Sequence, residues 1–150
     1  MIVVIQRVKK ASVVIDGEVS GECSHGLLIL LGVAEGDTEK DADLLAAKIS
    51  KLRIFSDENG KMNLSVKDVS GEMLVVSNFT LLANYVKGNR PDYFGAAAPE
   101  TAEKLYKYFG ALSEKEVSHV GYGIFGADME VTIVNDGPVT IVMDSHVLSK

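Results

Sequence analysis

The sequence predicts a mixed α/β fold of the α+β kind: a mainly antiparallel, curled and barrel-like sheet with two helices packed on it. Apolar runs of strand type outnumber segments of helical period, and most of the runs are joined by turns. Just two segments place apolar residues at helical spacing. With 150 residues, 47% of them apolar and 24% charged, the chain is expected to form one domain over residues 1–150.

The N-terminal segments predict a strand, a hairpin and a buried strand. Residues 2–8 and 11–16 alternate or run apolar, and Asp16-Gly17 turns the chain into residues 18–22. Residues 26–34, GLLILLGVA, are apolar throughout, which is typical of a strand that is covered on both faces.

Two segments predict helices. In the first, Asp37 or Thr38 is an N-cap and acidic residues occupy the first turn. The second begins at Pro99, because proline is favoured in a first helical turn. Their buried stripes are expected at Ala42, Leu45, Ile49 and Leu52 and at Ala102, Leu105, Phe109 and Leu112.

Between the helices, residues 72–78 predict a strand that runs directly into Phe79. Residues 84–98 contain Gly88, Pro91 and Gly95 and have no helical period. An irregular segment of this length in a small domain is usually functional or mobile.

The C-terminal part predicts three strands, at residues 117–125, 129–134 and 139–144. The last two form a near-mirror, VTIV-NDGP-VTIV, and two β-branched runs around Asp136-Gly137 predict a hairpin. Pro138 is then the first residue of the returning strand, where it has no N–H for the ladder. The reason for a proline at that position is not evident from the pattern.

Several classes of protein are excluded by composition. No apolar run is long enough to span a membrane, and the charges of the N-terminus follow its apolar residues, unlike a signal peptide, so a cytoplasmic location is expected. The single cysteine, Cys23, excludes an internal disulfide and is interpreted as incidental rather than nucleophilic. None of His25, His119 and His146 is followed by a metal-binding residue two to four positions later, so neither a metal nor a cofactor is expected.

The net charge of −6 argues against general nucleic-acid binding. The cations are clustered, however, so that a local basic surface is compatible with the sequence. The clusters are Arg7, Lys9 and Lys10; Lys48, Lys51 and Arg53; and Lys87 and Arg90.

Composition and spacing alone select no catalytic group. Ser77, His119 and Asp144 would make a triad on paper, but triads are recognised by geometry. Ser77 and Thr80 stand at the end of a strand, where side chains reach a pocket, yet both hydroxyls could equally cap the following loop. The glycines of GYGIFG, residues 121–126, are interpreted as places where another backbone approaches closely.

Two motifs allow a more specific interpretation than composition and spacing do. SNFTLLA at 77–83 and NDGPVT at 135–140 strongly resemble the two signature motifs of D-aminoacyl-tRNA deacylases, the D-Tyr-tRNA deacylase family, and collinear segments such as QRV at 6–8 and KGNRP at 87–91 extend the resemblance over almost the whole chain. The family's first motif usually reads Ser-Gln-Phe-Thr. Asn78 replaces that glutamine and is shorter by one methylene, which puts any reach-dependent contact in doubt.

The resemblance implies a homodimer that hydrolyses the ester of D-aminoacyl-tRNA without a cofactor. Catalysis is implied at Ser77, Asn78, Phe79 and Thr80, where main-chain N–H groups would stabilise the oxyanion while the 2′-OH of the terminal adenosine helps to activate water. A cis Gly137-Pro138 would reach into the partner's site and reject L-residues by collision with its carbonyl oxygens. Glycine would escape this filter, so Gly-tRNA is an expected second substrate.

The remaining site residues follow from the same resemblance. The substrate pocket is expected at Phe125, Gly126, Ala127, Met129 and Asn135, and tRNA contacts are expected at Lys87, Arg90 and Arg7. Within the enzyme class, Thr80 as a covalent nucleophile is a weaker alternative because it lacks a nearby base in sequence. Two other functions stay open: a related tRNA-editing domain with a trans Gly137-Pro138 bond that admits small L-residues, and a non-catalytic RNA- or ligand-binding dimer.

Overall fold

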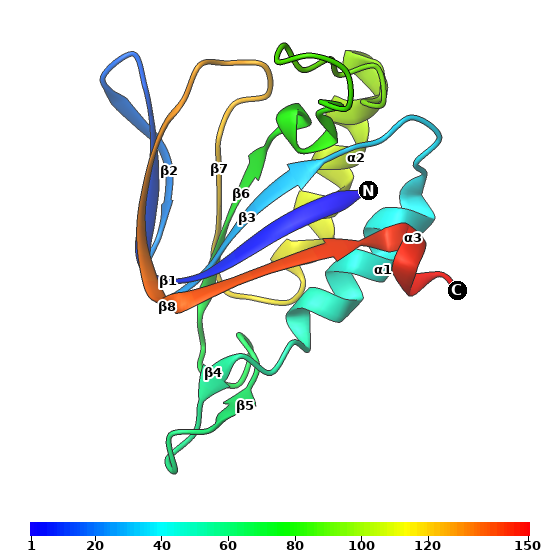
Figure 1. Cartoon of the computed structure of the whole chain (residues 1–150). Coiled ribbons are helices and arrows are strands. Elements are labelled where there is room, and N and C mark those ends of the chain that lie inside the picture. The colour runs from blue at the N-terminus through cyan, green and yellow to red at the C-terminus, as the bar shows by residue number, and fades with distance from the viewer.

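The core of the structure is a six-stranded sheet in the order β2-β1-β3-β6-β7, with β8 paired to β1 along nearly its whole length (Figure 1). A computed structural model describes all residues, 1–150. The strands are β1 (Ile2–Ile15), β2 (Glu18–Cys23), β3 (Gly26–Gly32), β6 (Glu72–Ser77), β7 (Val120–Tyr122) and β8 (Glu130–Asp144).

The sheet is mixed rather than mainly antiparallel, which corrects the prediction. β1 is antiparallel to β2, β3 and β8, but β3 and β6 are parallel, and so are β6 and β7. The two helices explain the difference. α1 (Glu39–Ser50) connects β3 to β6 and α2 (Pro99–Glu114) connects β6 to β7, and a crossover of this kind returns the chain in the same direction.

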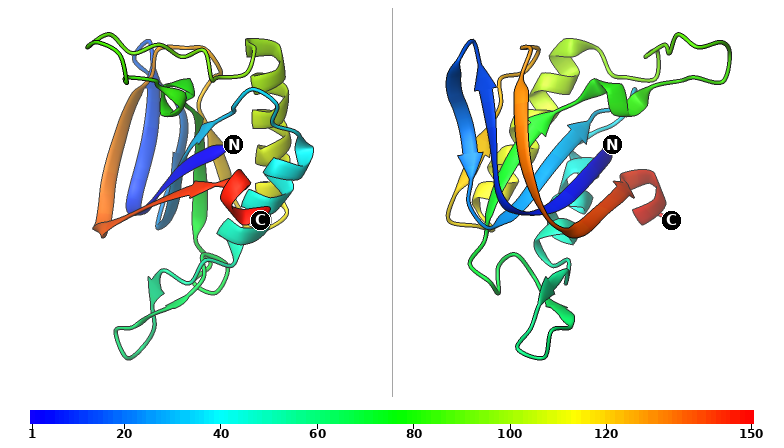
Figure 2. Two further views of the ribbon diagram at one scale, coloured as in Figure 1. Left: turned by 45° about the vertical axis from the view of Figure 1, so that its right-hand side comes forward. Right: turned by 60° about the vertical axis from the view of Figure 1, so that its left-hand side comes forward.

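Both predicted helices are present and lie together on one face of the sheet (Figure 2). Thr38 is the N-cap of α1, and its N–H donates to the Asp41 carboxylate at 2.8 Å. Pro99 begins α2 as predicted. Two short helices were not predicted: the 3₁₀ helix η1 (Phe79–Leu82) and α3 (Ser145–Leu148). None of the helices combines the length and the apolar composition that a membrane span needs.

The strand β3 is buried on both faces, as its unbroken apolar run predicts. Leu27, Ile29 and Leu31 pack in the larger core cluster with residues of both helices, whereas Leu28 packs in a smaller cluster on the other face. Cys23 belongs to that smaller cluster, and burial raises the pKa of its thiol to about 11. The thiol is therefore protonated at neutral pH, which confirms its interpretation as a packing residue.

The curled sheet is nearly closed where β2 approaches β7. A Cβ atom at Gly121 would overlap the carbonyl oxygen of Glu22, and one at Gly21 would overlap that of Tyr122. The Ser20 hydroxyl donates to the Tyr122 carbonyl at 3.0 Å across the same seam. At Gly121 the prediction of a close backbone approach is therefore confirmed.

Gly121→Ala is expected to lower the free energy of unfolding by about 1–3 kcal/mol, because a backbone carbonyl cannot move aside as a flexible side chain can. Urea denaturation measures the change. Gly95→Ala is the matched control: its Cβ would meet no atom closer than 3.9 Å, and its stability should be unchanged or slightly raised. Equal stability for both variants would contradict the closed seam.

The predicted hairpin at residues 129–144 is wrong. These residues form one continuous strand, β8, whose first part (130–134) pairs with residues 10–14 and whose last part (140–144) pairs with residues 2–6 of β1. Each VTIV copy thus pairs with a different part of a single long partner. Residues 136–139 have no partner in the ladder and form the β8 bulge. Pro138 therefore has no ladder bond to make, and its peptide bond with Gly137 is cis.

Candidate active site

The C-terminal ends of three parallel strands meet at one edge of the sheet, which in α/β proteins is where ligands bind. β6 ends at Ser77 and continues into η1, while β7 is followed by the segment 123–129 (Figure 1, top). The Gly123 nitrogen lies 3.4 Å from the Val75 carbonyl oxygen, and the Asn78 N–H donates to the Leu31 carbonyl at 2.8 Å. This edge therefore brings the first motif close to the start of the predicted substrate pocket.

Within the first motif, Asn78 and Thr80 bind each other. The Asn78 carboxamide oxygen accepts from the Thr80 N–H at 3.2 Å and also from the Thr80 hydroxyl, which makes Asn78 the N-cap of η1. Phe79 is the first residue of η1, so its N–H has no acceptor within that helix. Its side chain is 58% exposed and stacks edge-on against Tyr93, with ring centroids 5.0 Å apart.

The triad that could be assembled on paper does not form. Ser77 ends β6, whereas His119 precedes β7 and its Nε2 lies 2.9 Å from the Glu22 carbonyl oxygen. Asp144 accepts from the His146 N–H at 2.9 Å and caps α3. No hydroxyl of the first motif is hydrogen bonded to a basic side chain, since the Thr80 hydroxyl donates to Asn78.

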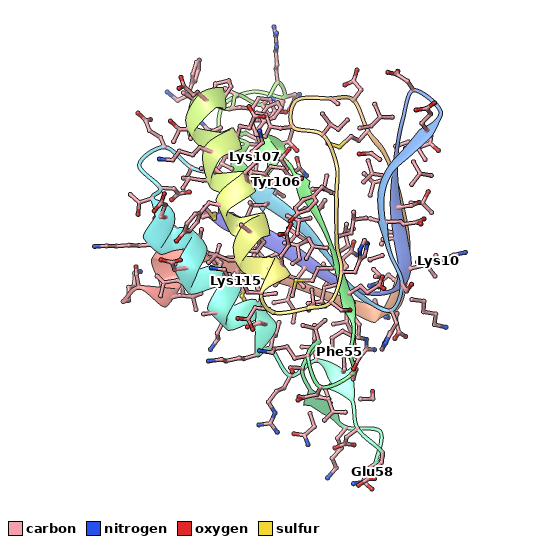
Figure 3. All side chains as sticks on the ribbon, turned by 180° about the vertical axis from the view of Figure 1, so that it is seen from behind. Lys10, Phe55, Glu58, Tyr106, Lys107 and Lys115 are labelled. Carbon is pink, nitrogen blue, oxygen red and sulfur yellow. The ribbon has the colours of Figure 1, made fainter.

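A groove of about 440 Å³ lies between α2 and the segment after β7. Its aromatic lining residues are Tyr106, Tyr122 and Phe125, and Tyr106 projects from α2 toward the sheet (Figure 3). The Tyr106 hydroxyl donates to the Val75 carbonyl at 2.9 Å, and burial raises its pKa to about 12. Burial and a hydrogen bond to Glu114 also raise the pKa of Tyr122. Both phenols are neutral at ordinary pH, so the groove presents aromatic faces.

The predicted pocket residues are distributed over different places. Phe125 lines the groove, and Gly126, at φ +79°, and Ala127 form the turn that follows it. Met129 is partly buried and packs on the smaller core cluster. Asn135 lies elsewhere: its amide donates to the Arg7 carbonyl at 2.9 Å and to the Val139 carbonyl at 3.1 Å, so it braces the β8 bulge.

Arg7 is part of the same bulge. Its Nε donates to the Asp136 carbonyl at 2.8 Å, its Nη1 donates to the Ile54 carbonyl at 2.6 Å, and its side chain is only 12% exposed. A guanidinium held by these hydrogen bonds has little freedom to contact a phosphate. The structure therefore favours a role for Arg7 in holding the bulge in place. Sequence alone does not distinguish the two roles, because a cation in a strand looks the same in both.

The two motifs lie at opposite ends of the sheet. Val8 pairs with Asn135 on one side and with Gly26, the first residue of β3, on the other. Ser77 pairs with Leu31 near the other end of β3, which spans seven residues, or about 20 Å. In Figure 1 the bend of β8 lies at lower left and η1 near the top. One chain therefore does not bring Thr80 and Pro138 together.

Lys87 and Arg90 are exposed in the loop that follows η1, and neither makes an ion pair with an acidic side chain. The loop is closed on itself by two backbone hydrogen bonds between Asn84 and Asp92, of 2.8 and 2.9 Å. The large apolar side chains of this loop, Tyr85, Val86 and Phe94, are more than 70% exposed. The loop thus presents free cations and apolar surface beside the first motif.

Comparison with known proteins gives concordant results. A family model described as D-Tyr-tRNA(Tyr) deacylase matches residues 4–144. A D-aminoacyl-tRNA deacylase of Dehalococcoides mccartyi is 57% identical over 143 residues, which cover 95% of this chain and 94% of that protein. One of Bacillus cereus is 52% identical over 145 residues, which cover 97% and 99%.

Solved structures agree with the fold. A structure titled c-Myc DNA Unwinding Element Binding Protein has a TM-score of 0.90 and 42% sequence identity over 96% of this chain and 98% of that chain. A probable eukaryotic D-amino acid tRNA deacylase has a TM-score of 0.80 at 15% identity over 95% of this chain and 98% of that chain, which shows a shared fold.

Proposed function

The chain belongs to the D-Tyr-tRNA(Tyr) deacylase family, and we propose that it hydrolyses the ester between a D-amino acid and the 3′ end of tRNA at a site shared by two copies of the chain. The match of residues 4–144, which includes both motifs, carries the assignment of the reaction. The products are free tRNA and the D-amino acid. As an enzyme that would act on charged tRNA, it is expected in the cytoplasm.

The proposed homodimer is supported by the separation of the two motifs. The first motif and the β8 bulge lie about 20 Å apart along the sheet, yet the resemblance gives both a role at one substrate. A two-fold dimer resolves this, because each copy can present its bulge to the other copy's first motif. Exposed Ile133 and Val142 on β8, an edge strand, offer apolar area for the contact.

The proposed catalytic step uses the main chain. The Phe79 N–H, which has no acceptor within η1, would donate to the oxyanion that forms on the ester carbonyl, and the Thr80 N–H would join it after exchanging its bond to Asn78. The Thr80 hydroxyl has no basic partner, which argues against a covalent mechanism. Water would then be activated with help from the substrate's own 2′-OH.

Selection of the D-ester is proposed to occur at the β8 bulge of the second copy. Carbonyl oxygens of Gly137 and Pro138 that face the substrate Cα would collide with an L side chain and leave room for a D side chain. Such rejection depends little on which side chain is present, so several D-aminoacyl-tRNAs and also Gly-tRNA should be hydrolysed. Arg7 donates to the Asp136 carbonyl of this bulge, and Asn135 donates to the Arg7 and Val139 carbonyls on either side of it.

Binding of the tRNA end is proposed at the groove and the neighbouring loop. The terminal adenine would stack on aromatic side chains of the groove, of which Phe125 belongs to the segment after β7. Lys87 and Arg90 would contact phosphates of the acceptor end. With a net charge of −6, binding should be modest and weaken with salt.

Arg7→Ala is expected to lower kcat/KM for D-Tyr-tRNA at least about tenfold and to increase hydrolysis of the L-ester relative to it. The variant loses the charge-assisted hydrogen bond to the Asp136 carbonyl of the bulge, which contributes about 1.5–3 kcal/mol, and the bond to the Ile54 carbonyl that holds the guanidinium in place. Lys9→Ala, which removes an exposed cation of the same strand, is the control and should retain near-normal kinetics. Normal selectivity in Arg7→Ala would show that the bulge needs no such support.

The function itself is tested by hydrolysis of matched D-Tyr-tRNA and L-Tyr-tRNA, with Thr80→Ala beside the wild type. The expected result is rapid loss of the D-ester alone, with Thr80→Ala within about tenfold of wild type because the main-chain donors remain. Cleavage of the L-ester would indicate the related editing activity. Stable binding of tRNA without turnover would indicate the non-catalytic alternative, and a complete loss in Thr80→Ala would favour the nucleophile.

A further inference from the structure

A cluster of ionisable groups lies outside the candidate active site, where α3 meets the N-terminal end of α1. One ligand atom each from Asp37, Asp41 and His146 lies within 4.8 Å of the other two. His146 Nε2 is 3.1 Å from Asp37 Oδ1 and 3.8 Å from Asp41 Oδ1. Asp37 and Asp41 are four positions apart, but His146 comes from a distant part of the sequence, so local spacing does not indicate the complete cluster.

The buried oxygen of Asp37 is the unusual feature. The Asp37 side chain is 0% exposed, and its Oδ2 is occupied by the Ala34 N–H at 2.6 Å and the Met1 α-ammonium at 2.7 Å. Its Oδ1 is buried without any hydrogen bond, although His146 Nε2 lies close to it. An unpaired carboxylate oxygen in a buried position is costly, and this one lies beside the ligand atoms of Asp41 and His146.

We propose that Asp37, Asp41 and His146 bind one divalent transition-metal ion of the zinc class, with water completing its coordination. A tetrahedral ion with ligand bonds of about 2.0–2.1 Å separates neighbouring ligand atoms by roughly 3.4 Å. The two histidine–carboxylate separations, 3.1 and 3.8 Å, lie on either side of that value. An imidazole nitrogen among the ligands selects zinc-like ions over magnesium and calcium.

The surroundings fit a cation. Three carboxylates, those of Asp37, Asp41 and Asp144, and the Met1 α-ammonium leave two uncompensated negative charges when His146 is neutral. Asp144 Oδ1 lies 3.7 Å from His146 Nδ1, on the side of the ring away from Asp37. Metal-binding histidines commonly have a carboxylate on that second nitrogen, which orients the ring.

The ion would connect three separate segments. It would tie α3 to the first turn of α1 and, through the bond between Asp37 and the Ala34 N–H, to the residues that follow β3. The residues that follow β3 are in turn hydrogen bonded to the loop after η1, because the Glu35 N–H donates to the Gly95 carbonyl at 2.9 Å. The role assigned to the ion is therefore structural, and the proposal does not depend on the deacylase reaction.

The test is isothermal titration of the chelator-treated wild-type chain with ZnCl₂, with MgCl₂ for comparison. The expected result is one zinc ion per chain and no magnesium binding, with affinity at least tenfold weaker in His146→Gln. The His146 side chain is 56% exposed, so its replacement should leave the fold intact. The control His119→Gln, whose ring contacts Glu22 instead, should bind zinc as the wild type does.

A second measurement uses the unaltered chain. Zinc at about a hundredfold excess over its dissociation constant should raise the thermal midpoint by roughly 5 °C or more, and should protect His146, but not His25 or His119, from acylation. The proposal is overturned if the wild type binds no zinc at submillimolar concentration, if His146→Gln binds zinc equally well, or if all three histidines stay equally reactive.

Discussion

Phe79→Pro is expected to lower kcat for hydrolysis of D-Tyr-tRNA by about 10²–10³-fold, the usual loss for one oxyanion donor. The change removes one main-chain N–H together with the phenyl ring. Phe79 is the first residue of η1, where proline is tolerated, and Asn78 before it has an extended backbone, φ −149° and ψ 90°, outside the helical region that a following proline disfavours. Single-turnover kinetics at saturating enzyme separate this chemical step from binding.

The matched control is Phe79→Ala, which keeps the N–H and removes the ring stacked on Tyr93. It should lose far less activity, and mostly through KM, because the ring is on the surface of the loop rather than at the reacting carbon. Equal kcat values for the two variants would rule out a catalytic role for the Phe79 N–H. A circular dichroism spectrum like that of the wild type shows that the proline has not disturbed the fold.

Mixing two impaired variants is expected to restore activity. In an equal mixture of Phe79→Pro and Arg7→Ala chains that have been unfolded and refolded together, half of the dimers contain one chain of each kind. In such a dimer, one of the two sites combines the intact first motif of the Arg7→Ala chain with the intact bulge of the Phe79→Pro chain. The mixture should therefore reach about a quarter of wild-type activity, from the symmetry of a two-fold dimer alone.

Two controls complete the mixing experiment. Each variant refolded alone should stay at its own low rate, and the two variants mixed without unfolding should gain activity only as fast as subunits exchange. If the refolded mixture shows no more than the average of the two separate rates, each site is built from one chain, and the dimeric arrangement proposed above is wrong.

Elements whose residue pattern is contained within their own stretch of sequence were predictable. α1 combines a cap at Thr38 with a buried stripe, α2 begins at Pro99, and the unbroken apolar run of β3 matches a strand covered on both faces. The parallel pairs were not predicted, because direction depends on which strands the crossovers join, and that is decided by packing over long distances.

The repeated VTIV pattern shows where local reasoning fails. Two β-branched runs around Asp136-Gly137 normally pair with each other, but here β1 is 14 residues long and offers each run its own stretch of ladder. Nothing within residues 131–142 contains that information. The strand predicted at 117–125 is likewise shorter in the structure, Val120–Tyr122, because the residues after it form the turn beside the groove.

For the site, the strand-end position of the first motif was predictable and its internal bonding was not. A strand that runs into Phe79 places the motif at an edge, as the structure confirms. The mutual binding of Asn78 and Thr80, the commitment of Arg7 to the bulge and the contribution of Tyr106 to the groove all depend on side-chain directions that single-residue patterns do not specify.

The distance between the first motif and the β8 bulge has a kinetic consequence. If each working site takes one part from each chain, an isolated chain carries both parts and can use neither. Specific activity then depends on enzyme concentration: it is constant while the subunits stay associated and falls on dilution below their dissociation constant. Any partner or condition that loosens the association would lower proofreading without touching a residue of the site, so that subunit affinity itself becomes a means of control.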